Sequence, residues 1–176
     1  MLTLKHTLVA LVTDKPGVLN RASSLFRRRG FNIDSITVGH SELPHVSRMT
    51  IVVIGSAAMV EQVRKQLEKL VDVIKVADVT GDGTITRELA LIKVKANSTS
   101  RSEIMQIVDI FRAKIVDVSA ESVTIEATGD EDKLSSLHNL LRGFGIKEIA
   151  RTGCIAMVRG GNKSAAIDIE ALKDIE

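Results

Sequence analysis

The sequence predicts an α+β fold built from two βαββαβ units of the split βαβ kind, and two observations support this. Segments rich in apolar and β-branched residues alternate with segments in which apolar residues recur at helical spacing. The order strand, helix, strand, strand, helix, strand then recurs in the second half of the chain. Thr50-Ile51 and Gly55 match Thr124-Ile125 and Gly129, 74 positions later, which indicates an internal repeat.

Four strands and two helices are expected in the first half. The strands cover residues 5–13, 31–39, 46–54 and 71–79, which are rich in apolar and β-branched residues. The first helix opens at Pro16-Gly17 and ends before Gly30, because proline favours a first turn and glycine a helix end. The second helix carries an apolar stripe made of Met59, Val60, Val63, Leu67 and Leu70.

The second half repeats this order after a glycine-containing linker at residues 80–86. Strands are expected over residues 88–96, 114–118, 122–128 and 146–158, and helices around the stripes Ile104 to Phe111 and Leu134 to Phe144. The expected domains are therefore residues 1–79 and residues 87–160. Residues 161–176 form a tail, in which residues 164–176 either make a short acidic helix or fray.

The strand over residues 46–54 is apolar on both faces. Met49, Ile51 and Val53 point one way, while Val52 and Ile54 point the other. A βαββαβ sheet carries both helices on one face, so its open face must be covered by the other repeat or by a second chain. We expect a dimer with further partner contacts, and we extend the prediction of sheets apolar on both faces to both units.

Composition excludes several classes of protein. The chain has 176 residues, 44% of them hydrophobic, and a formal net charge of +2, which is unlike a disordered protein. Its four aromatic residues are all Phe, and residues 47–53 contain none, which argues against RNA binding and against nucleic acid in general. The longest uncharged run, residues 49–60, is too short to span a membrane, and no signal peptide is evident, so a cytoplasmic protein is expected.

The residue types that commonly act in catalysis or bind metals are dispersed along the chain. The single cysteine, Cys154, excludes an internal disulfide framework, and the four histidines have no neighbours at metal-ligand spacing. His40 and His45 are interpreted as solvated loop residues. No glycine-rich phosphate loop follows a strand, and the arginines at 27–29 are explained as cations at a helix C-terminus. We therefore expect no catalytic residue, no metal and no cofactor in this chain.

The loop Asp14-Lys15-Pro16-Gly17 is the exception, because it lies between the first strand and the first helix. Free backbone N–H groups at a helix N-terminus suit a small carboxylate, and Gly17 allows a ligand to approach closely. Asp14 could accept a hydrogen bond from an ammonium group. Together these features would form half of an amino-acid site. Alternatively, Asp14 caps the helix or shapes the turn, and Pro16-Gly17 merely starts the helix.

The chain resembles the small regulatory subunits of acetolactate synthase (acetohydroxyacid synthase), a family whose members begin with an ACT domain. The resemblance runs from about His6 to Arg159. It rests on residues 14–19 (DKPGVL), 29–35 (RGFNIDS), 47–51 (SRMTI) and 87–94 (RELALIKV), and extends through 111–113 (FRA) and 125–129 (IEATG).

This resemblance implies two ferredoxin-like domains, an N-terminal ACT domain and a C-terminal ACT-like domain, in a subunit without its own active site. The large catalytic subunit would hold thiamine diphosphate, Mg²⁺ and FAD, and the small subunit would activate it and confer feedback inhibition by valine or a related amino acid. ACT domains of the family pair as homodimers. Asp14 and Gly17 of one chain would form one wall of each effector site, and Asn32 and Ile33 of the other chain the opposite wall; Asn is also common in the family at position 14.

Other classes of function remain as alternatives. A free-standing ACT-domain sensor acting on another protein would use the same loop, although a transcriptional version would need a DNA-reading helix, and none is evident. A small βαββαβ enzyme such as an acylphosphatase would need an arginine-bearing anion loop after its first strand. Here Lys15 occupies that loop without the rest of the pattern.

Overall fold

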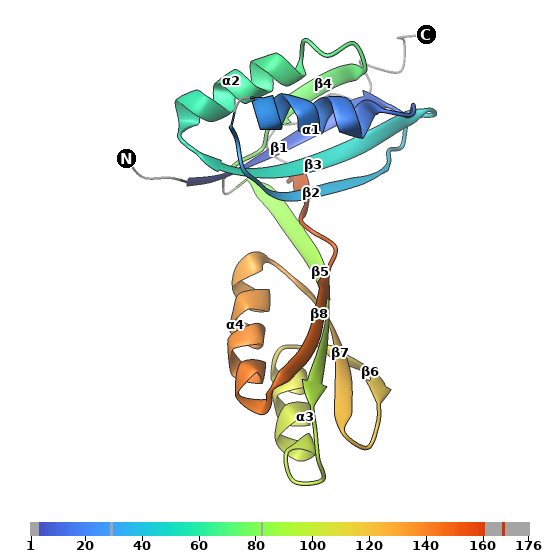
Figure 1. The fold of residues 1–176 in the computed structure, drawn as a ribbon, viewed down its shortest axis with the longest axis vertical. Coiled ribbons are helices and arrows are strands. Elements are labelled where there is room, and N and C mark those ends of the chain that lie inside the picture. The colour runs from blue at the N-terminus through green and yellow to red at the C-terminus, as the bar shows by residue number, and fades with distance from the viewer. Residues whose placement is uncertain (1–3, 29, 82, 161–166, 168–176) are drawn as a thin grey trace. The chain divides into compact units, whose positions relative to one another are not determined.

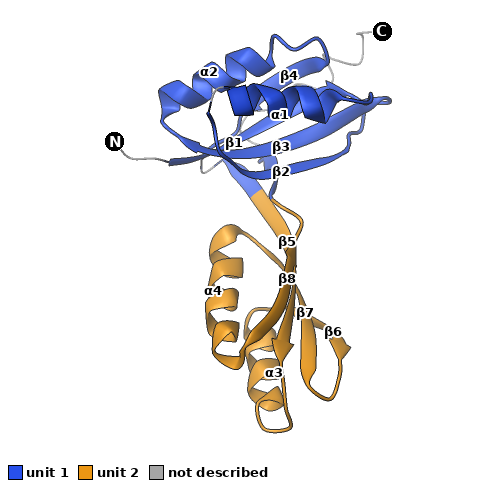
Figure 2. Cartoon of the chain, in the orientation of Figure 1, with its two compact units in different colours: residues 1–85, 154–176 blue, residues 86–153 orange. Residues whose placement is uncertain are grey.

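The protein is described here by a computed structural model that covers residues 4–28, 30–81, 83–160 and 167 (Figure 1). The chain forms two compact units (Figure 2). The first unit comprises Met1–Ile85 together with Cys154–Glu176, and the second comprises Thr86–Gly153.

The first unit has the expected βαββαβ order. Its elements are β1 (Leu4–Thr13), α1 (Val18–Arg28), β2 (Ile33–His40), β3 (Val46–Gly55), α2 (Ala57–Leu67) and β4 (Val73–Asp78). The strands form an antiparallel sheet in the order β2-β3-β1-β4, so β2 and β4 are its edges. Both helices cover the same face of this sheet (Figure 1).

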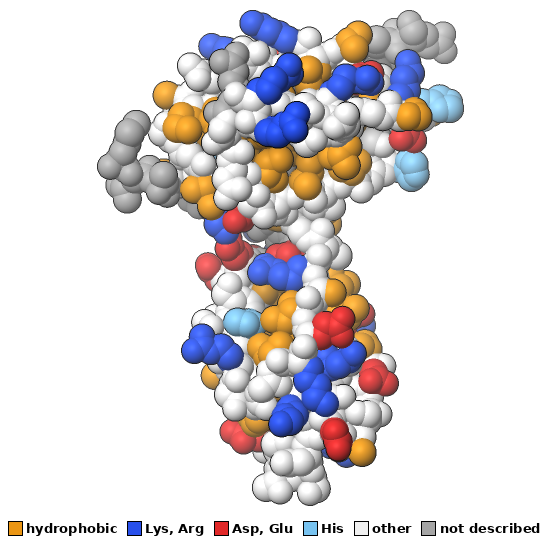
Figure 3. Space-filling view, in the orientation of Figure 1, with side chains coloured by type: hydrophobic (Ala, Val, Ile, Leu, Met, Phe, Trp, Pro, Cys, Tyr) orange, Lys and Arg blue, Asp and Glu red, His pale blue; other side chains and the backbone are white. Residues whose placement is uncertain are grey.

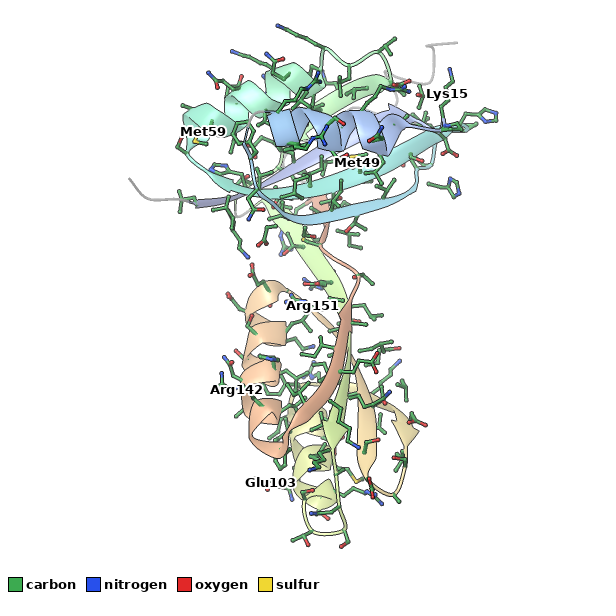
Figure 4. All side chains as sticks on the ribbon, viewed as in Figure 1. Lys15, Met49, Met59, Glu103, Arg142 and Arg151 are labelled. Atoms are coloured by element: carbon green, nitrogen blue, oxygen red, sulfur yellow. The ribbon has the colours of Figure 1, made fainter. Side chains whose placement is uncertain are left out.

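Every second side chain along the strands points toward the helices, and these side chains fill the space between the sheet and its helices. Leu8, Ala10 and Val12 of β1 point to this side and pack in one buried cluster with Phe26 of α1 and Val63 of α2. The same cluster contains Met49, which Figure 4 labels beneath α1. The helical and strand periodicities of the sequence therefore meet in one core, as expected.

The second unit repeats the topology. Its elements are β5 (Thr84–Lys95), α3 (Arg101–Ile110), β6 (Lys114–Val118), β7 (Ser122–Gly129), α4 (Glu131–Leu141), a short 3₁₀ helix η1 (Arg142–Phe144) and β8 (Ile146–Arg151). The sheet order is β6-β7-β5-β8, and Ile92 and Ile125 on its helix-facing side share a buried cluster with Leu137 of α4. The predicted α+β fold with two ferredoxin-like units is confirmed.

The prediction of one last strand over residues 146–158 is wrong. The structure has two strands, β8 (Ile146–Arg151) and β9 (Ile155–Val158), because the chain turns at Gly153, where φ is +86°. Strand β9 pairs with β5, and the Arg159 N–H donates to the Gly83 carbonyl at 2.8 Å. The residues from Cys154 onward are grouped with the first unit, whereas the sequence placed residues up to 160 in the second domain.

The tail is described at one residue. Ile167 packs beside a buried cluster of the first unit. The two interpretations of residues 164–176, an acidic helix or a frayed end, otherwise lie outside the described residues.

Residues 154–158, called here the covering segment, lie on the open face of the first sheet. The Cys154 N–H donates to Ser35 Oγ at 2.9 Å, and Thr37 Oγ1 donates to the Cys154 carbonyl at 3.0 Å. Arg48 Nη2 donates to the Ala156 carbonyl at 2.9 Å. Ala156 is buried against Val9 and Val79, with 4% of its surface exposed. This part of the open face is therefore covered by the chain itself rather than by the other repeat or a second chain.

The second sheet departs from the prediction of two apolar faces. Because Ile92 and its alternate neighbours face the helices, Leu91 and Lys93 of β5 lie on the open face. Lys93 Nζ lies 3.1 Å from Glu148 Oε2 there, and Leu91 pairs in register with Ala150 and Glu126. Basic and acidic side chains lie side by side on the visible face of this unit (Figure 3). That open face is a mixed polar surface.

Candidate functional site

The loop between β1 and α1 holds a conformation that depends on glycine. Gly17 has φ of +88°, in the left-handed region that L side chains adopt only under strain, and its carbonyl accepts from the Arg21 N–H at 3.0 Å. The Asp14 N–H donates to the His45 carbonyl at 2.8 Å, which anchors the loop to the turn before β3. Lys15 projects from this end of the first unit (Figure 4).

The side chain of Asp14 does not cap α1. Its Oδ2 atom lies 3.6 Å from His40 Nδ1, and the carboxylate is about half exposed. Within the described part of the chain, no side-chain oxygen accepts from the backbone N–H of Leu19 or Asn20 in the first turn of α1. Asp14 is thus accessible to a ligand ammonium group, and the helix N-terminus retains donors for a carboxylate.

His40 lies beside the candidate loop, which the sequence interpretation did not anticipate. It is exposed, as expected of a solvated residue, but it is the last residue of β2 rather than a loop residue, and it pairs in register with Ser47. Thr13 pairs with Val46, one position away on β3. The strand register therefore brings His40 to the Asp14 end of the sheet, and only knowledge of that register could have shown it.

Two further charged residues lie at this loop. Arg21 Nε, on α1, donates to Asp72 Oδ2 at 2.5 Å, and Asp72 precedes β4 and is largely buried. Thr13 Oγ1 lies 3.5 Å from Asp72 Oδ1, and the Thr13 N–H donates to the Asp72 carbonyl at 2.8 Å. Arg21 and Asp72 are 51 positions apart, so no local sequence pattern marks them as a pair.

The other two candidate residues lie at the opposite end of the same sheet. Asn32 is exposed and immediately precedes β2, and Ile33 is half-buried against the core. Ile33 pairs in register with Val53 of β3, whereas Thr13 pairs with Val46. Seven residues of strand separate these two levels, or about 23 Å at ~3.3 Å per residue. Within one chain, the structure does not bring Asn32 and Ile33 together with Asp14 and Gly17.

Figure 4 makes this separation visible through two labelled residues. Lys15 marks the loop before α1, and Met59, in the first turn of α2, lies at the other end of the first unit. Met59 lies beside Gly55, the residue that ends β3 two positions after Val53. Asp14 and Gly17 thus lie at one end of the unit, and Asn32 and Ile33 lie at the other.

Shifted pKa values occur on α2 and β3 of the first unit. Hydrogen bonds from Arg64 lower the pKa of Glu61, on α2, to about 2. Burial lowers the pKa of Arg48, which holds the covering segment, and Glu42 opposes that shift. Among the residues that the structure describes, no group of His, Cys, Asp or Glu could hold a metal ion, and no helix is long and apolar enough to cross a membrane.

Comparison with known proteins gives a consistent result for both units. A family model described as "Small subunit of acetolactate synthase" matches residues 87–160, and one described as "AHAS small subunit-like ACT domain" matches residues 8–75. A "Probable acetolactate synthase small subunit" of Archaeoglobus fulgidus is 57% identical over 160 residues, which cover 91% of this chain and 100% of the relative. The acetolactate synthase small subunit of Mycolicibacterium smegmatis is 54% identical over 158 residues, or 90% of this chain and 93% of the relative.

A solved structure agrees with these sequence matches. The acetolactate synthase small subunit of Thermotoga maritima superposes with a TM-score of 0.83 at 47% sequence identity. The match covers 89% of this chain and 98% of that one.

Proposed function

The chain belongs to the acetolactate synthase small-subunit family, and we propose that it is a non-catalytic regulatory subunit acting in the cytoplasm. It activates the large catalytic subunit and confers feedback inhibition by valine or another branched-chain amino acid. The catalytic subunit holds thiamine diphosphate, Mg²⁺ and FAD and condenses two 2-oxoacids. Support comes from the relatives, which are named as small subunits of this enzyme.

The observation that carries the proposed effector site is the position of β2 at the edge of the first sheet, as formed by the described residues. A β-bulge between Ile33 and Ser35 makes Thr37 the middle register position of β2, so a two-fold homodimer that pairs the whole of β2 with β2 antiparallel has its centre at Thr37. That symmetry sets Ile33 of the second copy opposite His40 of the first, and His40 lies beside Asp14. One operation thus joins two half-sites that are about 23 Å apart within a chain.

The chemistry of the joined site fits a free amino acid with a branched side chain. Asp14 accepts hydrogen bonds from the ammonium group, and the first-turn N–H groups of α1 face the carboxylate. Asn32 and Ile33 of the second copy close the opposite wall, where Ile33 supplies an apolar contact. A carboxylate, an ammonium group and an aliphatic side chain are thus each matched.

Inhibition follows from a shift between two arrangements of the dimer. An amino acid that binds across two chains stabilises the arrangement in which they are held together at β2. If that arrangement activates the catalytic subunit less well, a coupling free energy of roughly 1–3 kcal/mol gives about fivefold to 150-fold control. The effector then acts at a distance from the active site without touching it.

The direct test mixes the purified chain with an acetolactate synthase catalytic subunit and measures acetohydroxyacid formation. We expect the rate to rise when the chain is added, and to fall again with L-valine, L-leucine or L-isoleucine but not with D-valine. No change of rate under any condition would refute the proposal. Binding of valine without any effect on the catalytic subunit would instead favour a free-standing ACT-domain sensor acting on another protein.

A further inference from the structure

An ion pair between Arg21 and Asp72 lies directly beside the candidate effector loop. Arg21 Nε donates to Asp72 Oδ2 at 2.5 Å. The Asp72 side chain is 11% exposed, whereas the Arg21 side chain is 47% exposed. A buried carboxylate therefore holds one edge of a guanidinium whose remainder is accessible.

Asp72 is itself fixed in place from the sheet. The Thr13 N–H donates to the Asp72 carbonyl at 2.8 Å, and Thr13 Oγ1 lies 3.5 Å from Asp72 Oδ1. Thr13 is the last residue of β1, immediately before the loop. The Asp72 carboxylate is thus fixed in position relative to β1, the strand that leads into the loop. It can therefore hold Arg21 in a defined orientation with respect to Gly17.

The guanidinium lies against the side of Gly17 where another residue would carry a Cβ atom. At the position where a side chain on Gly17 would begin, the nearest atom is Arg21 Nη1 at 3.6 Å, followed by Arg21 Cζ at 3.9 Å. Across the described ranges, Asp72 is the acceptor seen for Arg21, and it engages Nε. The Nη1 and Nη2 hydrogens are therefore available to a ligand that occupies the space beside Gly17.

We propose that Arg21 binds the α-carboxylate of the amino-acid effector, and that Asp72 is the positioning residue that orients its guanidinium. The inference rests on the proposed function and names the group that recognises the ligand's acid end. The terminal edge of a guanidinium presents two parallel N–H donors, which match a carboxylate in bidentate fashion. The N-terminus of α1 adds donors on the same side.

A purely structural ion pair makes a different prediction. If Arg21 only neutralised the buried Asp72, its removal would loosen the loop and weaken every ligand of the site by the same factor. If Arg21 binds the ligand carboxylate, its removal weakens only ligands that carry one. Amino-acid amides distinguish the two cases, because L-valinamide keeps the ammonium group and side chain of L-valine but lacks the carboxylate.

The experiment measures binding to the full-length chain by calorimetry, using L-valine, L-leucine, L-isoleucine and their amides. Arg21→Met is compared with wild type, and Arg27→Met, in the last turn of the same helix, is the matched control. The double variant Arg21→Met/Asp72→Asn removes both charges, so that no buried carboxylate is left unpaired. We expect both Arg21 variants to weaken the preferred acid by about tenfold or more and its amide by less than about twofold, and Arg27→Met to change neither.

Equal weakening of acid and amide in the Arg21 variants would overturn the inference, and so would acid binding that matches wild type. In both cases wild type still binds the acid, so the proposed function stands. If wild type binds none of the three amino acids, the proposed function itself fails, and this inference fails with it.

Discussion

The two units share a topology but differ in the loop that joins their first strand to their first helix. In the second unit, Asn97 Oδ1 accepts from the Thr99 and Ser100 N–H groups at 3.0 and 2.8 Å, and Ser100 Oγ accepts from the Asn97 N–H at 3.1 Å. This loop uses its own side chains to satisfy its backbone. In the first unit, Asp14 Oδ2 lies 3.6 Å from His40 Nδ1 instead, and the Arg21 guanidinium lies against Gly17. The difference places the candidate effector site in one copy of the repeat only, so the site is a property of the loop rather than of the fold.

The open faces of the two sheets differ as well. The first sheet has Val9 and Val79 covered by Ala156, while the second presents the exposed pair Lys93 and Glu148. An apolar face needs a cover, and a face of mixed charge does not. The covering segment thus lies on the sheet whose open face is apolar and needs a cover.

The largest expected effect comes from changing Gly17, and it tests the difference between the loops of the two units. Gly17→Asp places a carboxylate within reach of Arg21, where the ligand's carboxylate would bind. We expect activation of the catalytic subunit to survive and the valine concentration for half inhibition to rise by at least about thirtyfold, or ~2 kcal/mol of binding free energy. The measurement is acetohydroxyacid formation against valine concentration.

Two control variants are needed. One separates the effect of the added charge from that of backbone strain, and the other separates the loop of the first unit from that of the second. Gly17→Ala carries the strain of φ +88° without a carboxylate, and Ser98→Asp places the same charge in the equivalent loop of the second unit. Normal valine inhibition in Gly17→Asp, or an equal loss in Ser98→Asp, would remove the distinction between the two loops.

The next largest effect is on stability, and it tests the difference between the open faces of the two sheets. Ala156→Asp buries a carboxylate among Val9 and Val79 and should lower the stability of the first unit by about 3 kcal/mol, or roughly 6–12 °C in Tm. Ala150→Asp, on the exposed open face of the second sheet, should change stability by less than ~0.5 kcal/mol. Thermal unfolding followed by calorimetry measures both, and equal effects would show that the two faces do not differ as described.

A smaller effect is expected from the hydrogen bonds that hold the covering segment. Ser35→Ala and Thr37→Val each remove one bond to Cys154 and should destabilise the first unit by about 0.5–1.5 kcal/mol. Thr124→Val makes the same chemical change on the open face of the second sheet and serves as the control. Urea unfolding gives the free energies; a loss in Thr124→Val as large as that in Thr37→Val would argue against a specific role for the covering segment.

The smallest effect is the pH dependence of the ion pair on α2. Two hydrogen bonds from Arg64 lower the pKa of Glu61 to about 2 in the folded chain, below the ordinary value of about 4.3. The pair therefore stabilises the fold fully above the ordinary pKa, and this contribution is lost as the pH falls toward 2. Titration of the Glu61 carboxyl by NMR should show the low pKa in wild type and a higher one in Arg64→Met. A value near 4.3 in wild type would contradict the geometry.

Much of the fold followed from local patterns, and the misses have physical causes. The strand over Lys114–Val118 was predicted with its observed bounds, because flanking turns and β-branched residues define it. The run from Ile146 to Val158 looks like one strand because most of its residues suit a sheet, although Gly153 interrupts it. Both halves pair with β5, but the hydrogen bonds that place the second half on the open face of the first sheet join residues more than 100 positions apart, and no local pattern contains that information.

The site divides in the same way. Asp14 and Gly17 were found because a loop with glycine before a helix is a local signal. His40, Arg21 and Asp72 reach that loop through strand register and a contact across 51 positions, so the sequence alone could not group them. The pairing with Asn32 and Ile33 came from family resemblance, and it requires a second chain.

The central claim, that each effector site is built from two copies of the chain, is tested most directly by mixing two inactive variants. Gly17→Asp disables the loop wall, and Asn32→Glu disables the strand wall, so neither homodimer should respond to valine. After subunit exchange, each mixed dimer has one site with both changes and one intact site, and roughly a quarter of all sites should recover. We predict that valine inhibition returns in part when the variants are mixed with the catalytic subunit. Confirmed subunit exchange with no return of inhibition would contradict the two-chain site.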